Sequence, residues 1–311
     1  EVVAGVVTAA EELFDVISAE EKEELTFSFD DEKQKRRWSN LPVSSVPRKG
    51  LQMGDLNDEQ KGAVLKLVRS TMSERGYQQV LDNMAGDQWL KENGRGRPDF
   101  GFDHYYVSIL GKPSATTPWM WQFGGHHLGV NATIVGDQIT LSPSLTGGQP
   151  VDFEYEGRQI RQLAGDEDLA FELVGSLTAE QLKEAIEGRH HVNLTFGPRT
   201  WSTKPKKEGI VASKLTAEQQ ALLIRLIEER VGILNETHTK IAMKGLIEEL
   251  PQTYFAWFGP TKKGSAATYR VQGPSILIEY SPQHLGGDLT QHTHAMYRDP
   301  SNDYGVGFLA D

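Results

Sequence analysis

Two histidines spaced two residues apart near the C-terminus form the sharpest chemical pattern in the chain. His292 and His294 lie in the segment Thr290 to Tyr297, whose composition is typical of a β-strand. In a strand, residues two apart point to the same face, so both imidazoles can converge on one ion. Two imidazoles on a strand suit Zn²⁺, Fe²⁺ or Cu²⁺. We therefore expect His292 and His294 to bind a metal; the alternative is two surface histidines on an edge strand.

A second pair of adjacent histidines offers a third metal ligand. His126 and His127 follow two glycines and the aromatic, strand-like segment Trp119 to Phe123. Adjacent strand residues point to opposite faces, so at most one of the two should face a given site. Either can be the third ligand, and the alternative is one buried and one exposed histidine. The remaining histidines are expected to be structural or to lie in loops, among them His191 and His284.

Two charged residues complete the predicted site. Glu279 lies near the end of the apolar strand Ser275 to Tyr280, where a charge is costly unless it is paired or bound to metal. We expect it to be a ligand or a general base, or else the solvated end of an edge strand. Arg298 falls on the same strand face as His292 and His294, so it would orient an anionic group or stabilise negative charge. Asp299 points the other way and is expected to be a hydrogen-bond partner of a ligand.

Aromatic residues precede the second histidine pair. Trp119 and Trp121 could form a stacking wall for a sugar substrate, together with other aromatic side chains. Aromatic residues at strand spacing more often belong to a hydrophobic core. Both interpretations stay open at this stage.

Composition excludes several classes of protein. The chain has 311 residues, no cysteine, and 32 Lys+Arg against 43 Asp+Glu, for a formal net charge of −11. Without cysteine there are no disulfides, thiolate nucleophiles or iron–sulfur clusters. The acidic balance argues against a nucleic-acid partner, since the one basic cluster, at residues 204–207, reads as a solvated loop. No apolar run approaches the roughly 20 residues of a membrane-spanning helix.

The order of the predicted elements indicates the fold class. Four helix starts carry a small polar residue followed three positions later by Glu or Gln, at Ser18, Asn57, Thr178 and Thr216. Helices, then strands, then helices, then strands predict an α+β fold, with an N-terminal helical segment and middle helices packed on a largely antiparallel sheet. We expect a single domain over 1–311, with any internal boundary near 197–209. The likeness of the starts at Thr178 and Thr216 is explained by shared capping chemistry rather than by an internal repeat.

The sequence resembles the bacterial family catalogued as domain of unknown function 3500. The likeness covers nearly the whole chain, and its most specific blocks are Pro118 to Leu128, Tyr269 to Pro274, Ile278 to Tyr280 and His292 to Asp299. The chain departs from the commoner family pattern at Ser281 to Asp288, where an Asn- and Asp-rich run is usual. The resemblance supports the fold and the location of the site and leaves the reaction open. Many members look exported, and the chain begins with Glu1 rather than Met, so a periplasmic or extracellular location is expected.

These residues together predict a metal-dependent enzyme with one mononuclear, histidine-rich centre. An incomplete set of protein ligands leaves a position for water, which is typical of catalytic rather than structural sites. We expect a zinc hydrolase that acts on a small-molecule or carbohydrate-type substrate. A copper- or iron-dependent oxidoreductase is the first alternative, and a non-enzymatic metal- or carbohydrate-binding protein is the second. The sequence makes no prediction of the oligomeric state.

Overall fold

The computed structural model describes residues 1–93, 97–198, 206–285 and 287–309, and its elements form two successive sets. We call residues 2–148 the N-terminal half; it contains α1 (Val2–Val16), α2 (Ala19–Leu25), β1 (Thr26–Phe27), α3 (Glu32–Lys35), β2 (Leu51–Gln52), α4 (Asp58–Ser70), α5 (Glu74–Glu92), β3 (Tyr106–Leu110), β4 (Trp119–Gly124), β5 (Leu128–Val135), β6 (Gln138–Thr140) and β7 (Ser144–Gly148).

A separate hairpin, β8 (Asp152–Tyr155) and β9 (Arg158–Arg161), leads to the second set of elements. We call residues 164–298 the C-terminal half; it contains α6 (Ala164–Ser176), α7 (Ala179–Ala185), β10 (Ile186–Gly188), β11 (Ile210–Val211), α8 (Ala217–Val231), α9 (Glu236–Glu249), β12 (Tyr254–Phe258), β13 (Thr268–Gln272), β14 (Leu277–Pro282) and β15 (Thr293–Arg298). The expected boundary at 197–209 and the basic cluster at 204–207 lie largely outside the described residues.

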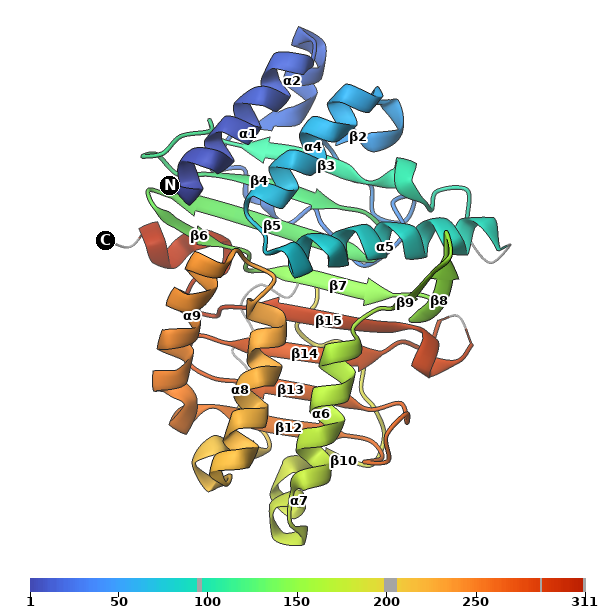
Figure 1. Cartoon of the computed structure of the whole chain (residues 1–311), viewed down its shortest axis with the longest axis vertical. Coiled ribbons are helices and arrows are strands. Elements are labelled where there is room, and N and C mark those ends of the chain that lie inside the picture. The colour runs from blue at the N-terminus through green and yellow to red at the C-terminus, as the bar shows by residue number, and fades with distance from the viewer. Residues whose placement is uncertain (94–96, 199–205, 286, 310–311) are drawn as a thin grey trace.

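A 13-stranded sheet runs through both halves (Figure 1). Its order is β1-β3-β4-β5-β7-β15-β14-β13-β12-β10, with β2, β6 and β11 paired beside this path. The strand pairs are antiparallel except for β1 with β3 and β10 with β12. The predicted α+β class with a largely antiparallel sheet is confirmed. None of the described helices is long and apolar enough to cross a membrane.

The two halves repeat one topology about the central pair β7 and β15. At the junction Met72 and Leu234 form an antiparallel bridge. Its hydrogen bonds are reciprocal: the Ser73 N–H donates to the Ile233 carbonyl and the Asn235 N–H donates to the Thr71 carbonyl, both at 3.0 Å. Ser73 and Asn235 are the N-caps of α5 and α9, so equivalent residues meet at a local two-fold axis.

A pair of glycines supports the equivalence of the two halves. Gly50 and Gly209 both have positive φ, at 99° and 87°. A Cβ on Gly50 would lie 2.0 Å from the Val107 carbonyl oxygen, and one on Gly209 would lie 2.1 Å from that of Phe255. Each glycine therefore lets its chain approach the first long strand of its own half, β3 or β12.

The internal repeat does not relate the two helix starts that look alike in the sequence. All four predicted helix starts form capping boxes, at Ser18, Asn57, Thr178 and Thr216. The equivalent pairs are α2 with α7 and α4 with α8, so the likeness between Thr178 and Thr216 joins non-equivalent helices. The repeat was missed because its period is close to 160 residues and the loops between equivalent elements differ in length.

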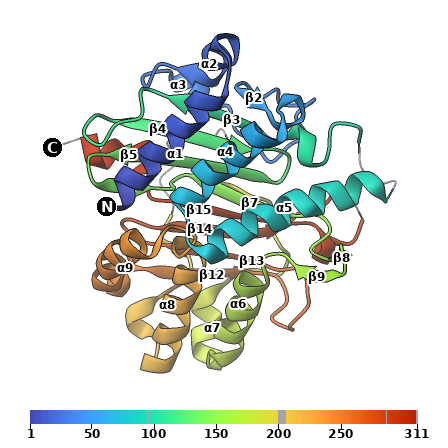
Figure 2. The same ribbon diagram turned by 45° about the horizontal axis from the view of Figure 1, so that its top comes forward.

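Helices cover one face of the sheet and irregular chain covers the other (Figures 1 and 2). One core packs α1, α4 and α5 on the strands of the N-terminal half, and a second packs α6 to α9 on those of the C-terminal half. We call residues 28–50 and 189–198 the covering segments. They bind the opposite face through buried polar pairs, such as Gln34 with Gln122 and the Phe196 N–H with Glu279. This face thus carries buried polar pairs beside small apolar clusters, such as Trp38 with Leu145 and Met296.

Candidate metal centre

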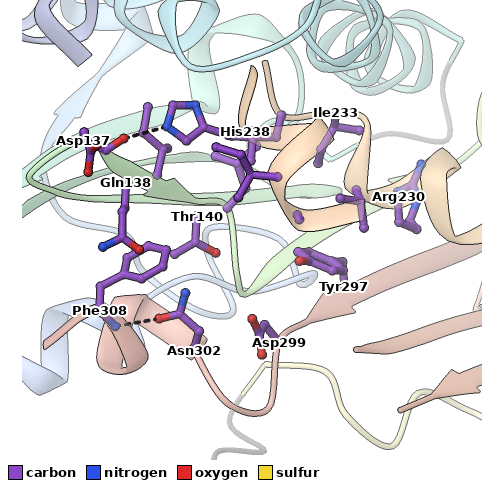
Figure 3. A pocket seen from close by; sticks show the side chains of 16 residues that line it. Asp137, Gln138, Thr140, Arg230, Ile233, His238, Tyr297, Asp299, Asn302 and Phe308 are labelled. Carbon is purple, nitrogen blue, oxygen red and sulfur yellow. Dashed lines mark hydrogen bonds between the residues drawn. The ribbon is translucent and has the colours of Figure 1, made fainter. Parts of the chain in front are cut away.

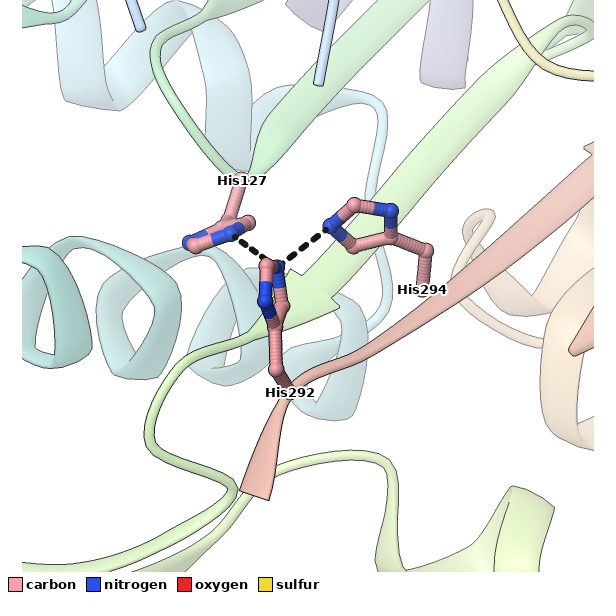
Figure 4. A group of neighbouring side chains, drawn as sticks. All are labelled: His127, His292 and His294. Carbon is pink, nitrogen blue, oxygen red and sulfur yellow. Dashed lines mark hydrogen bonds between the residues drawn. The ribbon is translucent and has the colours of Figure 1, made fainter. Parts of the chain in front are cut away.

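Three histidines meet where the two halves join (Figure 4). His127 lies in the turn between β4 and β5, His292 directly precedes β15, and His294 lies in β15. β7 connects them, because Gly147 pairs with His294 in the ladder and its N–H donates to the His127 carbonyl at 2.7 Å. The structure thus brings together one histidine of the N-terminal half and two of the C-terminal half.

The ring nitrogens of these histidines converge. Nε2 of His292 lies 3.2 Å from Nε2 of His127 and 3.2 Å from Nε2 of His294. All three side chains are buried, and their candidate ligand atoms lie within 4.8 Å of one another, so the group could hold a metal ion. Zinc–nitrogen bonds of about 2.0–2.1 Å at tetrahedral angles place two nitrogens about 3.3 Å apart. The observed spacing fits that geometry.

Hydrogen bonds at the opposite nitrogens orient the rings. Nδ1 of His127 lies 3.2 Å from a carboxylate oxygen of Asp87, and Nδ1 of His292 meets the Leu285 carbonyl. Both partners can only accept, so each Nδ1 carries the proton and each Nε2 of the neutral ring holds a lone pair. Nδ2 of Asn40 lies 3.3 Å from Nδ1 of His294, and because an amide nitrogen only donates, Nδ1 of His294 accepts in this contact.

Burial keeps these three imidazoles neutral. Desolvation, reinforced by neighbouring imidazoles, lowers the pKa of His127 to about 4 and that of His292 to about 4. The same causes lower the pKa of His294 well below its usual value. At neutral pH the lone pairs of His127 and His292 therefore face each other without a proton between them. A cation bound to both nitrogens would satisfy this arrangement.

Asp87 is a buried carboxylate that the sequence did not single out. One of its oxygens lies 3.2 Å from Nδ1 of both His126 and His127, and the other accepts a hydrogen bond from the Tyr105 hydroxyl at 2.9 Å. Burial alone would raise the pKa of Asp87, but its contacts with His126 and His127 outweigh burial and lower it. A signal existed, since Asn83, Asp87 and Leu90 form a stripe at helical spacing on the buried side of α5.

Gly147 sets how closely two of the rings approach. A Cβ at this position would lie 2.6 Å from Cδ2 of His294 and 3.1 Å from Cδ2 of His127. Contacts under 3.0 Å force something to move, and here backbone ladders hold both rings on either side of β7. The absence of a side chain at Gly147 is therefore part of the geometry of the site.

A cavity of about 510 Å³ opens beside the three rings. His292 and His294 line it, and so does His126, whose ring stacks on Phe100 with centroids 4.2 Å apart. Among the described residues no aspartate or glutamate lines it, and one guanidinium, that of Arg97, does. The other polar lining is mostly carboxamide: Asn40, Gln149, Asn193 and Gln283. The cavity thus offers neutral hydrogen-bonding groups next to the imidazoles.

A second hollow, of about 220 Å³, lies between the α8–α9 junction and β6 (Figure 3). Its lining is largely apolar, and its one imidazole, His238, already has partners on both ring nitrogens: Asn235 and the Asp137 carbonyl, each at 2.9 Å. Asp299 lines this hollow and bonds to Ser301 rather than to any predicted ligand. The expectation that Asp299 supports a ligand is therefore not met.

Glu279 does not join the histidines. It is fully buried on the covered face of β14, where Oε1 lies 2.8 Å from Nε of Arg270. Its Oε2 accepts the N–H groups of Thr195 and Phe196, at 2.8 and 2.9 Å. Both oxygens are used to bind a covering segment, which accounts for the buried charge without a metal.

Arg298 lies on the predicted strand face but at the wrong point along it. It lies four positions from His294 along the strand, a distance of about 13 Å at roughly 3.3 Å per residue. Its guanidinium donates to the carbonyls of Phe196 and Gly197, at 2.9 and 3.0 Å, and pairs with Asp303. The structure therefore gives Arg298 a structural role in place of the expected catalytic one.

Trp119 and Trp121 differ from expectation, whereas His126 belongs to a second group of possible ligands. It lies outside the group formed by His127, His292 and His294, but its ligand atom lies within 4.8 Å of those of Asp87 and His127, and these three could also hold a metal ion. Both tryptophans have 0% exposure and pack in the N-terminal core, so they form no stacking wall for a sugar. Their strand spacing reflects the face that α1 and α4 cover.

The loop that departs from the family pattern contributes a backbone group. Leu285 supplies the carbonyl that orients His292, whereas the Asp288 side chain accepts from the N–H and hydroxyl of Thr290. No curated protein and no solved structure matches the chain. A family model does match residues 1–306, under the description "Protein of unknown function (DUF3500)". The chain, with its buried histidine centre, belongs to this family.

Proposed function

We propose that the protein is a metal-dependent hydrolase in which His127, His292 and His294 bind one divalent ion. The observation that carries the proposal is the set of three Nε2 atoms directed at one another, with acceptors at Nδ1 of His127 and His292. Without a cation the contact between His127 and His292 is unfavourable, because these two neutral rings then oppose lone pair to lone pair. Proteins rarely bury such an arrangement without a purpose.

The donor set narrows the choice of metal. Three imidazoles with no carboxylate or thiolate suit Zn²⁺ or Cu²⁺ better than Mg²⁺ or Ca²⁺, which prefer oxygen. Non-haem iron oxygenases use two histidines and a carboxylate; the three-histidine group lacks the carboxylate, and the neighbouring group of Asp87, His126 and His127 contains one. Zinc with three protein ligands is the usual catalytic arrangement. When bound, zinc supplies a Lewis acid that polarises a substrate oxygen and activates water.

The residues around the histidines have separable roles in this proposal. Asp87 and the Leu285 carbonyl keep two Nδ1 protons in place, so the Nε2 lone pairs stay directed at the ion. The cavity, lined by carboxamides and by the Arg97 guanidinium, binds and orients a small polar substrate, such as a carbohydrate, through hydrogen bonds that both donate and accept. Phe100 packs on His126 and fixes one wall.

Metal analysis tests the proposed centre. Purified protein is expected to hold about one equivalent of zinc, and the double variant His292→Ala/His294→Ala is expected to hold none at this centre. His104→Ala is the matched control, since this half-buried histidine lies outside the group. Circular dichroism and thermal melting establish that the double variant is folded. Full zinc occupancy in a folded double variant would show that the ligands are other residues.

A panel of chromogenic esters, amides, phosphoesters and glycosides tests the reaction. We expect hydrolysis of at least one class by the zinc-loaded protein, loss on chelation, and recovery when zinc is restored. Zinc-independent hydrolysis, or equal rates in wild type and in the double variant, would refute the proposal.

A copper-dependent oxidoreductase is the second candidate, and the all-imidazole donor set favours it over an iron enzyme. Near-stoichiometric copper in the purified protein, with oxygen consumption on addition of reductant, would support this candidate and displace the hydrolase.

A further inference from the structure

A second imidazole pair lies outside the proposed centre. Nε2 of His191 lies 3.2 Å from Nε2 of His284, with ring centroids 4.7 Å apart. The two residues are 93 positions apart in the chain. His191 is half-buried in a covering segment, and His284 is exposed in the loop between β14 and β15. Neither residue was expected to bind a metal.

The backbone on both sides of this pair is fixed. Next to His191, the Val192 N–H and carbonyl both bond to the Thr268 hydroxyl, at 3.1 and 2.8 Å, and the carbonyl also accepts from the Ser281 hydroxyl at 2.6 Å. Next to His284, the Gln283 N–H donates to the His292 carbonyl at 2.7 Å. The two rings are therefore held in register by their neighbours rather than meeting as free surface side chains.

We propose that His191 and His284 bind a second divalent first-row metal ion, Zn²⁺, Ni²⁺ or Cu²⁺, at the mouth of the cavity. His284 lines the same cavity as His292 and His294, which puts this ion on the entry side of the centre. Two imidazoles select these metals over Mg²⁺ and Ca²⁺. With two protein ligands and open positions for water, this site is weaker and faster to exchange than a three-histidine site.

The local chemistry favours a neutral, ligand-competent ring at His191. Partial burial and the neighbouring imidazoles of His284 and His190 lower its pKa. Metal binding would also tie the covering segment 189–198 to the loop that presents the Leu285 carbonyl to His292. The second site would therefore stiffen one wall of the cavity.

Equilibrium dialysis of metal-free protein against Zn²⁺ tests the proposal. Wild type is expected to bind two equivalents, and His191→Ala/His284→Ala one. His190→Ala is the matched control, because it removes an exposed histidine from the same segment, and it should still bind two. Saturation of wild type at a single equivalent that persists in the double variant would overturn the proposal and reduce the pair to a hydrogen bond between rings. Two equivalents in the double variant would overturn it as well.

A second variant separates this proposal from that of the three-histidine centre. His292→Ala/His294→Ala should lose the tighter equivalent and keep the one at His191 and His284. If wild type binds one equivalent that is lost only in His191→Ala/His284→Ala, the second site stands and the proposed centre fails. The isosteric double variant His191→Gln/His284→Gln preserves side-chain volume, and it too should lose the equivalent; retention would again overturn the proposal.

Discussion

The turn between β4 and β5 is equivalent to the turn between β13 and β14. A helix carboxylate binds each turn, but the residue that it binds differs. Asp87 lies fourteen residues after the N-cap of α5, and Glu249 lies fourteen after that of α9. In the N-terminal half Asp87 contacts Nδ1 of His127. His127 lies two residues before Gly129, which forms the β4–β5 pair nearest the turn. In the C-terminal half Glu249 holds Ser275 at the matching position, with Oε1 2.8 Å from the hydroxyl and Oε2 3.0 Å from the N–H.

The helix carboxylate belongs to the fold, whereas the histidines belong to the candidate centre. A helix carboxylate that binds the neighbouring turn is common to both halves and is therefore part of the architecture. Among the described residues, an imidazole at that turn, facing two more at β15 across β7, occurs in the N-terminal half alone. The strand equivalent to β15 is β7, and the chain leading into β7 carries buried Ile139 and Leu141 in place of histidines. One of two equivalent positions thus holds the candidate centre.

A second equivalent pair explains why Glu279 is structural. Asn131 and Glu279 occupy matching positions on β5 and β14 and face Gln122 and Arg270 across the ladder. The Gln122 amide donates to Asn131 at 2.7 Å, and Arg270 donates to Glu279 at 2.8 Å. Each pair also binds a covering segment, through the Lys35 carbonyl or through the N–H groups of Thr195 and Phe196. Both halves thus have a polar cross-strand pair beneath a covering segment, and the pair is charged in the C-terminal half only.

Breaking these two pairs should give the largest effects on stability. Glu279→Ala removes the buried carboxylate that pairs with Nε of Arg270 and accepts the Phe196 N–H. Arg270 keeps its ion pair with Glu208, and we expect the free energy of unfolding to fall by about 3 kcal/mol. Asn131→Ala removes an uncharged partner and should cost about 1–3 kcal/mol. Urea denaturation measures both, and metal bound per folded molecule should be unchanged. A Glu279→Ala protein of normal stability that has lost its metal would instead assign Glu279 to the centre.

Gly147→Ala should disturb the centre from within the sheet. The added Cβ meets Cδ2 of His294 at 2.6 Å, so the ring must move away from its partners. We expect loss of most bound zinc, together with the roughly 1–3 kcal/mol that overpacking usually costs. Gly62→Ala is the matched control, since no atom lies within 4 Å of its Cβ position and alanine favours the helix. Normal zinc content in Gly147→Ala would mean that His294 is not a ligand.

Removing the charge of each helix carboxylate compares the two turns directly. Asp87→Asn takes the charged acceptor from Nδ1 of His127, and we expect zinc affinity to fall 10–100-fold, about 1.4–2.8 kcal/mol. Glu249→Gln changes the equivalent group beside Ser275 and should leave zinc affinity unaltered. Competition with a chromogenic chelator measures both affinities. Equal losses in the two variants would indicate a general effect on the fold rather than support of a ligand.

Local patterns were enough to predict most of the secondary structure. The hydrophobic alternation of residues 128–135 and 268–272 matches β5 and β13, and the polar residues at the four helix starts make the capping hydrogen bonds they suggested. The two-fold repeat was not accessible in this way. The two halves share their backbone pairing and a few single residues, such as Gly50 and Gly209. Such residues are too few to reveal a period of about 160 residues in the sequence.

The residues of the candidate site were likewise predicted only in part. The spacing of His292 and His294 correctly predicted two rings on one face, because strand geometry alone decides the face. The same rule misplaced Arg298, since a shared face says nothing about distance along the strand. Asp87 was missed because its partners come from a turn 40 residues away, which only the packing of α5 against the sheet brings close. Trp119 and Trp121 were ambiguous until the helix-covered face was known.

The smallest effects test whether equivalent helices are equally stabilised. Asn57 and Thr216 cap α4 and α8, and each accepts from the N–H three residues later, at 3.0 and 3.3 Å, while that residue's side chain accepts from the N–H of the cap. Asn57→Ala and Thr216→Ala should each lower the free energy of unfolding by about 1 kcal/mol, because each leaves a helix N–H without its acceptor. Urea denaturation of both variants, with zinc content as a second readout, measures the comparison. A cost confined to one half would show that the two helices, though equivalent in position, do not contribute equally to the folded state.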